Sequence, residues 1–158
     1  MKTAIFFGST TGATESVAKK VGELLGAEVF EASDIDKVED YDFVIFASST
    51  WGMGDLQDEW MDALDTLTTK NLAGKKVGFI GVGDQEGFGD TFVDAIGIIY
   101  EAIKDMGITL VGTTSTDGYN FGASRAIEDD EFIGLVIDEN NQSDLTDDRI
   151  KAWVEQVK

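Results

Sequence analysis

The sequence contains no cysteine and no histidine. Without cysteine the chain has no disulfide, no thiolate metal site and no cysteine nucleophile. Without histidine it lacks the usual general base and the commonest metal ligand, and a Ser-His-Asp triad is excluded. Nucleophilic catalysis of these kinds, and metal sites built on these ligands, are therefore ruled out.

Proline is absent too, although average usage of about 5% would give roughly eight residues, and no function follows from its absence. No stretch approaches the roughly 20 consecutive apolar residues of a membrane span. The first apolar run begins within a few residues of the N-terminus, which leaves no room for a signal peptide. We therefore expect a cytoplasmic protein with no membrane partner, and the 158 residues predict one domain, 1–158, with a substantial core.

Basic residues are scarce. The chain has 12 Lys and Arg against 31 Asp and Glu, which gives a formal net charge of −19. Such a surface repels nucleic acid and anionic membranes and favours partners with basic faces. Solubility alone is the other interpretation of the same charge. Nucleic acid is excluded as a partner on either interpretation.

Short apolar runs alternate along the chain with stretches of helical spacing. Apolar runs typical of strands buried on both faces occupy residues 4–7, 43–47, 77–82 (interrupted by Gly78 and Gly81), 108–111 and 132–137, and an alternating run at 27–32 predicts an edge strand. Apolar residues at helical spacing mark 17–25, 56–67, 92–106 and 150–157. This alternation predicts an α/β fold, in which a parallel sheet carries helices on both faces and function gathers at the carboxyl ends of the strands.

Local signals place the helix ends and the connections. Gly26 and Gly107 are expected to end helices, and Thr146 is expected to cap the last one. The acidic residues 33–40 are predicted to be a solvated connector. Residues 115–131 form a polar and irregular stretch before the last apolar run.

The turn at residues 8–14 is rich in glycine and hydroxyl groups and joins a buried strand to a helix. Such a turn directs free N–H groups, hydroxyls and the positive end of the helix dipole at one spot, which suits a phosphate. The turn has no Lys or Arg, so it does not match the triphosphatase loop, and it suits a terminal monophosphate. Simple capping of the helix is the alternative interpretation.

Two further loops follow strands at the same predicted edge, at residues 48–55 and 83–90. Each carries an aromatic residue flanked by glycine, Trp51 in the first and Phe88 in the second. Two exposed aromatics beside a phosphate turn could hold a planar ring between them by stacking. The alternative is that each ring lies back on the core.

Other nucleotide-binding patterns fail on particular residues. A dinucleotide fingerprint starting at Gly81 would need glycine where Glu86 stands. A phospho-acceptor receiver domain would need an acidic residue at the end of the second apolar strand, where residues 48–50 are Ser-Ser-Thr. Asp84 and Asp90 alone do not make a metal site or an acid/base pair, so neither a metal nor a catalytic residue is predicted.

Taken together, these motifs resemble the flavodoxin family over essentially the whole chain. Residues 8–15 (GSTTGATE) are similar to the family's phosphate loop, and residues 49–57 (STWGMGDLQ) and 81–92 (GVGDQEGFGDTF) resemble its two flavin loops. Residues 114–119, 134–139 and 147–150 resemble the long-chain subgroup, in which an inserted loop splits the last strand. The resemblance implies a doubly wound open sheet of strand order 2-1-3-4-5.

The resemblance also implies a function: a low-potential one-electron carrier with non-covalently bound FMN, which is not itself an enzyme. It implies a monomer that receives electrons from a reductase of the flavodoxin/ferredoxin type and passes them to acceptor oxidoreductases through basic docking faces. The residues implied to bind the cofactor are Ser9, Thr10, Thr11, Gly12, Ala13, Thr14, Ser49, Thr50, Trp51, Gly52, Met53, Gly54, Gly83, Asp84, Phe88, Asp90, Phe92 and Asn140.

Two positions depart from the family pattern. Phe88 stands where the family usually has Tyr, which keeps the stacking surface but loses a hydroxyl. Asn140 is a neutral amide where the long-chain pattern usually has Asp. Two other functions stay open at this point: an FMN-dependent NAD(P)H:quinone reductase on the same fold, and an interaction module without flavin.

Overall fold

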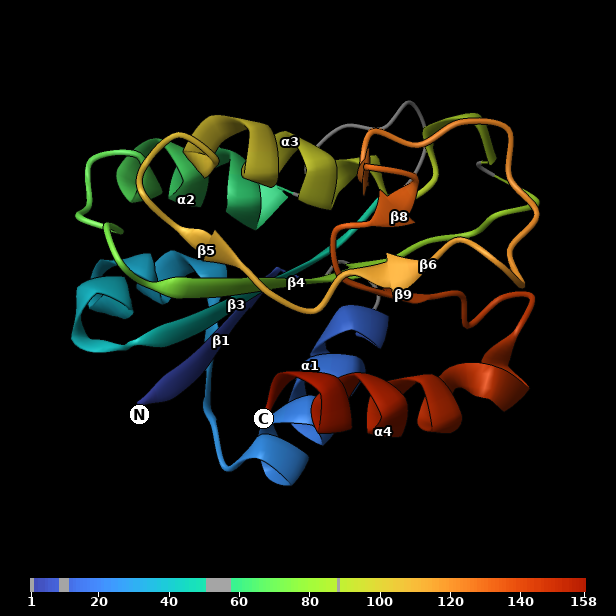
Figure 1. The fold of residues 1–158 in the computed structure, drawn as a ribbon, viewed down its shortest axis with the longest axis horizontal. Helices are drawn as coiled ribbons and strands as arrows, with labels where there is room; N and C mark the ends of the chain where they lie inside the picture. The colour runs from blue at the N-terminus through green and yellow to red at the C-terminus, as the bar shows by residue number, and fades with distance from the viewer. Residues whose placement is uncertain (1, 9–11, 51–57, 88) are drawn as a thin grey trace.

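The computed structural model describes residues 2–8, 12–50, 58–87 and 89–158 (Figure 1). Its main sheet is parallel and contains β1 (Thr3–Gly8), β2 (Glu28–Glu31), β3 (Phe43–Ser49), β4 (Lys76–Val82), β5 (Thr109–Leu110) and β9 (Leu135–Ile137). The strand order is β2-β1-β3-β4-β5, with β9 also paired to β4. The predicted order 2-1-3-4-5 is therefore confirmed.

The last strand of the sheet is split, as the resemblance implied. β5 pairs with Lys76 and Val77 at the start of β4, and β9 pairs with residues 80–82 at its end. Because β3 occupies the other edge of β4, β5 and β9 lie in line along the same edge. The chain between them, residues 111–134, is the insertion.

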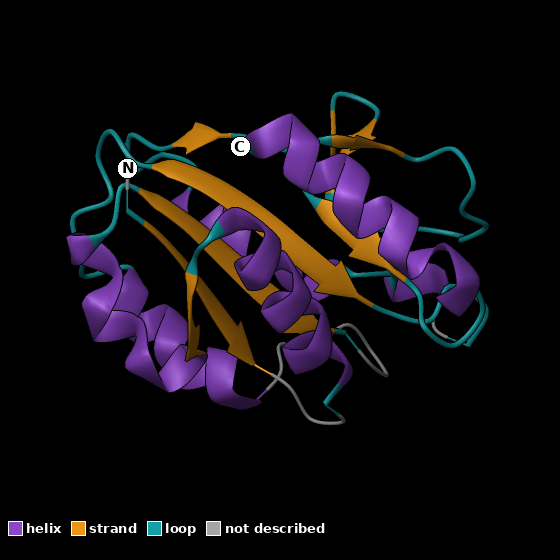
Figure 2. Cartoon of the chain, turned by 90° about the horizontal axis from the view of Figure 1, so that it is seen from below, coloured by secondary structure: helices purple, strands orange, loops and turns teal. Residues whose placement is uncertain are grey.

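Among the described residues, α-helices cover both faces of the sheet (Figure 1). On one face lie α2 (Asp58–Leu67) and α3 (Asp94–Ile103), and on the other lie α1 (Ala13–Leu25) and α4 (Thr146–Val157). Figure 2, seen from below, shows helices of the second layer crossing in front of the twisted strands. None of the helices in the described ranges is both long enough and apolar enough to span a membrane.

The alternation of side chains along each central strand builds two cores, one on each face of the sheet. In β1, Phe6 packs on the face of α2 and α3, whereas Ile5 packs on the face of α1 and α4. In β3, Phe46 and Ile45 divide in the same way. The two helix layers complete these cores and hold the strand ends in fixed register.

The acidic residues of the segment 33–40 are largely exposed, as the sequence suggested, but the segment is helical and not an irregular connector. It forms most of the 3₁₀ helix η1 (Ala32–Asp40). Ile35 and Val38 are buried in it because residues three apart share one face of a 3₁₀ helix. The acidic residues occupy its outer face.

Three predicted helix ends need correction, whereas Gly26 is confirmed as the left-handed cap of α1. α3 begins at Asp94 and not at Phe92, because Val93 has a left-handed φ of 50° that is incompatible with a helix. It ends at Ile103, before Gly107. Thr146 is the first residue of α4, and its side chain does not cap the helix.

The insertion is more regular than its polar composition suggested. It contains β6 (Thr114–Ser115), β7 (Ile127–Glu128) and β8 (Glu131–Phe132), which form a small antiparallel sheet in the order β6-β8-β7. Tyr119 and Phe121 from the insertion pack with Phe92 and Phe132 at ring-centroid distances of 5.1–6.0 Å. The insertion is therefore anchored to the domain by an aromatic cluster of its own.

Candidate functional site

The carboxyl ends of the central strands lie level with one another. Gly8 of β1 is in register with Ser48 of β3, and Ser48 is in register with Gly81 of β4. One residue further along, Ser49 of β3 is in register with Val82 of β4, and Val82 is in register with Ile137 of β9. The three predicted loops therefore leave the sheet at one edge, where open α/β sheets bind their ligands.

At the end of β1, the N-terminus of α1 has an unusual hydroxyl. Gly12 precedes the helix with a φ of 89° and, having no side chain, makes no side-chain cap to it. Thr14, in the first turn, is fully buried, and its Oγ1 has no hydrogen-bond partner among the described residues. Buried hydroxyls are nearly always hydrogen-bonded, so an unpartnered one at a helix N-terminus fits a bound anion. The predicted residues Ser9, Thr10 and Thr11 lie outside the described residues.

The end of β3 presents a second hydroxyl of the same kind. Ser49 is 2% exposed, and its Oγ is also without a partner in the described ranges. The Thr50 hydroxyl has a structural contact, because its Oγ1 accepts a hydrogen bond of 2.8 Å from the N–H of Ala95 in α3. This bond ties the end of β3 to the start of α3. Trp51, Gly52, Met53 and Gly54, the rest of this predicted loop, lie outside the described residues.

The loop after β4 is shaped by its own acidic residue. The carboxylate of Asp84 accepts hydrogen bonds from the N–H groups of Gly87 (2.8 Å) and Glu86 (3.1 Å). The side-chain amides of Asn141 and Asn140 also donate to it, at 2.7 and 3.1 Å. These bonds, above all the one from Gly87, lower the pKa of Asp84. The ionised carboxylate of Asp84 therefore stabilises the turn.

The structure separates the other residues predicted in this loop. Phe88 lies outside the described residues, and Asp90 is exposed with its carboxylate over the backbone of Gly122. Phe92 is 1% exposed inside the aromatic cluster, so its side chain is a core residue and not part of the strand-end site. Gly83 allows this packing, since a Cβ there would lie 3.2 Å from the Phe92 ring.

Asn140 lies beside Asp84, and its neighbours include residues that sequence reasoning missed. Asp138, directly after β9, is fully buried and accepts hydrogen bonds from Gln85, Asn140 and Asn141. Asp138 lies in the segment 134–139 that carries the family resemblance, but nothing in the sequence indicated its burial or its partners. Its long-range partner, Gln85, lies in the predicted loop 83–90 and was not predicted to bind it.

Asp94, at the start of α3, is a buried carboxylate that predicts a pH effect. Its Oδ1 accepts a 2.7 Å bond from the N–H of Arg125, and burial raises its pKa above 3.8. The folded state therefore holds more protons than the unfolded state just above pH 3.8, so the contribution of Asp94 to stability falls as the pH rises through this range. Asp94→Asn keeps an acceptor for Arg125 but has no charge to bury.

We expect the unfolding free energy of Asp94→Asn, relative to wild type, to increase as the pH rises from about 4 to about 7. Urea denaturation of the protein at several pH values measures this difference. Asp117→Asn, which removes an exposed carboxylate, is the control and should show no such trend. A constant difference for Asp94→Asn would contradict the burial effect.

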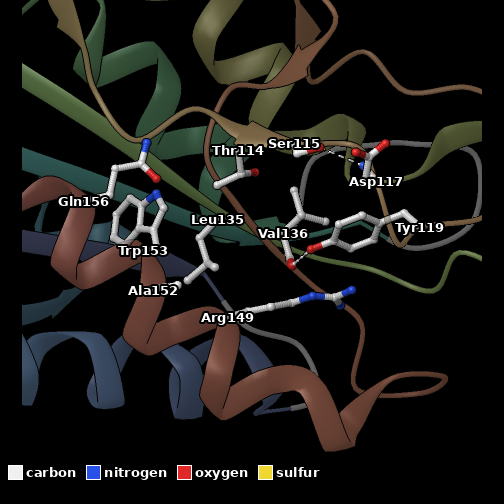
Figure 3. A pocket seen from close by; sticks show the side chains of 10 residues that line it. All are labelled: Thr114, Ser115, Asp117, Tyr119, Leu135, Val136, Arg149, Ala152, Trp153 and Gln156. Carbon is white, nitrogen blue, oxygen red and sulfur yellow. Dashed lines mark hydrogen bonds between the residues drawn. The ribbon is translucent and has the colours of Figure 1, made fainter.

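A pocket of about 220 Å³ lies between the insertion, β9 and α4, away from the strand-end loops (Figure 3). Its polar lining is largely bonded to the protein: Thr114 Oγ1 donates to Gly134 O, Gln156 Nε2 to Thr113 O and Arg149 Nη1 to Gln142 Oε1. We therefore place the candidate site at the strand ends and not in this pocket.

Comparisons with known proteins identify the family of the chain. The family model for flavodoxin matches residues 5–153. The chain is 47% identical to the flavodoxin of Helicobacter pylori, with 99% of this chain and 96% of that protein covered, and 44% identical to a flavodoxin of Nostoc sp., with 99% and 95% covered.

Among solved structures, the FMN-bound flavodoxin of Fusobacterium nucleatum superposes with a TM-score of 0.94 at 33% identity and covers 99% of this chain and 97% of that one. Flavodoxin 1 of Bacillus cereus, at 23% identity and a TM-score of 0.68, shares the fold. With a family match over most of the chain and relatives above 40% identity across nearly all of it, the protein belongs to the flavodoxin family.

Proposed function

We propose that this protein carries single electrons between redox proteins by means of non-covalently bound FMN. The observation that carries the proposal is the buried hydroxyl of Thr14 in the first turn of α1, which has no hydrogen-bond partner among the described residues. A phosphate there would accept its hydrogen bond and lie at the positive end of the helix dipole. When bound, FMN supplies the one-electron chemistry that a chain without histidine or cysteine lacks.

The proposed binding set divides by the chemistry of each residue. Residues 9–14 would hold the phosphate through hydroxyl and N–H donors, and Ser49 would donate a further hydroxyl. Trp51 and Phe88 would stack on the ring, with Gly52, Met53 and Gly54 beside it. Asp84, Asp90 and Asn140 would shape the rim, with Asp84 and Asn140 acting through the bond between them. Phe92 is left out of the set because it is a core residue.

The acidic surface supports a low potential. No Lys or Arg occurs in the strand-end segments 8–14, 48–60, 83–94 and 138–145. One like charge at ~10 Å, with an effective dielectric constant of ~20, opposes an added negative charge by roughly 1.7 kcal/mol. Since about 1.4 kcal/mol corresponds to about 59 mV for one electron, a few such carboxylates make the reduced protein a strong reductant.

The direct test is titration of the purified protein with FMN. We expect FMN fluorescence to be quenched at one equivalent and the complex to be yellow, whereas a module without flavin would stay colourless and leave the fluorescence unchanged. Steady-state oxidation of NAD(P)H by the isolated complex separates a carrier from a quinone reductase. Essentially no turnover is expected, because a carrier depends on a separate reductase for its electrons.

We further propose that its partners, a reductase of the flavodoxin/ferredoxin type and acceptor oxidoreductases, dock through basic faces on a monomeric carrier in the cytoplasm. The rate constant for electron transfer from such a reductase should then fall steadily with added salt, because the Debye length shrinks from ~30 Å at 0.01 M to ~3 Å at 1 M. Stopped-flow measurement gives this rate constant. Reoxidation by dioxygen, an uncharged acceptor, is the control, and a flat salt dependence with the reductase would contradict steering.

A further inference from the structure

Asp138 is a fully buried carboxylate at the point where β9 leaves the sheet. Its Oδ2 accepts hydrogen bonds from Gln85 N (3.0 Å), Gln85 Nε2 (2.8 Å) and Asn141 Nδ2 (2.9 Å). Its Oδ1 accepts the N–H groups of Asn140 (3.1 Å) and Asn141 (3.0 Å). No Lys or Arg among the described residues pairs with it. A buried carboxylate without a cationic partner depends on its N–H donors to offset the cost of burial.

Gln85 connects this carboxylate to the loop that follows β4. The main-chain N–H and the side-chain amide of Gln85 both donate to Asp138, and Gln85 is only 5% exposed. Its Oε1 accepts the N–H of Asn120, which belongs to the insertion. The loop is thus joined at one residue to the end of β9 and to the insertion.

Asp84, the residue before Gln85, belongs to the same network. The side-chain amide of Asn141 donates to Asp84 Oδ1 at 2.7 Å and to Asp138 Oδ2 at 2.9 Å. One amide therefore bridges the two carboxylates. The two loop residues that lead towards Gly87 are both fixed by the segment after β9, and Asp84 also bonds the Gly87 N–H directly.

The insertion can serve as a fixed support because it is held on both sides of Asn120. On one side, Tyr119 donates its hydroxyl to Val136 O at 2.6 Å, and the Arg149 guanidinium lies 4.1 Å from the Tyr119 ring centre (Figure 3). Burial raises the pKa of Tyr119 to about 12, so this hydroxyl stays a donor. On the same side, Gly118 O accepts a 2.7 Å bond from Gln142 Nε2. On the other side, the Phe121 ring packs against the rings of Phe92 and Phe132.

We propose that Asp138 is a positioning residue of the cofactor site: through Gln85 it fixes the loop at residues 83–87, with the insertion as the second support through Asn120. This inference rests on the proposed function, since the loop is part of the proposed FMN site. Asp84 and Glu86 bring two carboxylates into this loop. Asp138 therefore determines how close these charges stay to the bound cofactor, and the insertion contributes to the redox potential.

Asp138→Asn tests the proposal. The asparagine amide has the shape of the carboxylate, but its NH₂ group would face N–H donors that face a carboxylate oxygen in the wild type. We expect at least tenfold weaker binding of oxidised FMN, measured by fluorescence quenching, and a smaller loss for the reduced cofactor. The two-electron midpoint potential should become less negative, because the released carboxylates repel the added charge less. A tenfold larger loss for the oxidised than for the fully reduced cofactor corresponds to about 30 mV in this midpoint. Asp117→Asn, which removes the same charge from an exposed position of the insertion, should change neither quantity.

Gln85→Met is the second variant and is decisive if Asp138→Asn does not fold. It keeps the length of the side chain and four of the five hydrogen bonds to Asp138 but removes the amide that reaches both Asp138 and Asn120. The same direction of change in affinity and potential supports the proposal. Weaker binding with an unchanged potential would mean a purely structural role and would overturn it, as would unchanged binding. If wild type itself does not bind FMN, the proposed function fails and this inference fails with it.

Discussion

Replacing Thr14 by valine is expected to stabilise the apoprotein and, at the same time, to weaken FMN binding roughly 10- to 100-fold. The hydroxyl of Thr14 is buried and has no partner among the described residues, so removing it relieves a desolvation cost of about 1–3 kcal/mol. Valine has the same shape and a similar helix propensity, so little else changes. The loss of affinity is that of one hydrogen bond to a charged group, about 1.5–3 kcal/mol.

Thr146→Val is the matched control for this prediction. Thr146 is also buried in the first turn of a helix, its Oγ1 also has no partner in the described part of the chain, and it is outside the proposed binding set. It should raise the unfolding free energy of the apoprotein without changing the affinity for FMN. Urea denaturation and FMN titration of both variants give the two quantities. If Thr14→Val bound FMN as wild type does, the phosphate could not lie against this hydroxyl.

The sequence predicted part of this site but not the role of each hydroxyl. The composition of residues 8–14 was enough to predict a phosphate turn, because hydroxyls and glycines before a helix act locally. It did not show which hydroxyl lacks an internal partner. Thr50 and Ser49 are adjacent in sequence, but the first bonds the N–H of Ala95 and the second has no described partner. That difference depends on where α3 begins, which the periodicity placed two residues too early.

The fold was predictable where a signal is local and repeated. Apolar runs predicted the three central strands, because each is buried on both faces. The strand order came from the family resemblance, since periodicity carries no information on which strands are neighbours. The Gln85–Asp138 pair joins residues 53 apart and gave no warning in either segment. The ring-stacking prediction for Trp51 and Phe88 stays a prediction, since both lie outside the described residues.

The insertion was the least predictable segment because its contacts are made with the rest of the domain. Its polar composition did not indicate that two of its aromatic residues anchor it to the domain. A glycine in α3 did not indicate that another segment crosses the helix there. Gly97 lies in the middle of α3 and is buried. A Cβ at this position would meet the carbonyl oxygen of Arg125 and would lie 2.6 Å from its carbonyl carbon. The insertion therefore crosses α3 at a distance that only glycine allows.

Gly97→Ala is accordingly expected to destabilise the protein by about 3 kcal/mol, although alanine is favoured over glycine inside a helix by about 1 kcal/mol. The atoms that clash are main-chain atoms of the insertion, which have no rotamer to move into, so the insertion must lift away from α3. The thermal midpoint should fall by roughly 6–12 °C for a domain of this size. Ala102→Gly, at an exposed position of the same helix, calibrates the intrinsic difference between the two residues.

Hydrogen exchange identifies where the energy is lost. The N–H of Arg125 is bonded to Asp94, and the carbonyl of Ala126 accepts the N–H of Ile133, so both of these amides should exchange faster in Gly97→Ala if the insertion has moved. Because the insertion also holds Gln85 through Asn120, FMN affinity should fall together with stability, whereas Ala102→Gly should lower stability alone. A midpoint equal to or above that of wild type would mean that the insertion separates from α3 at little cost, and it could not then act as a fixed support for the loop after β4.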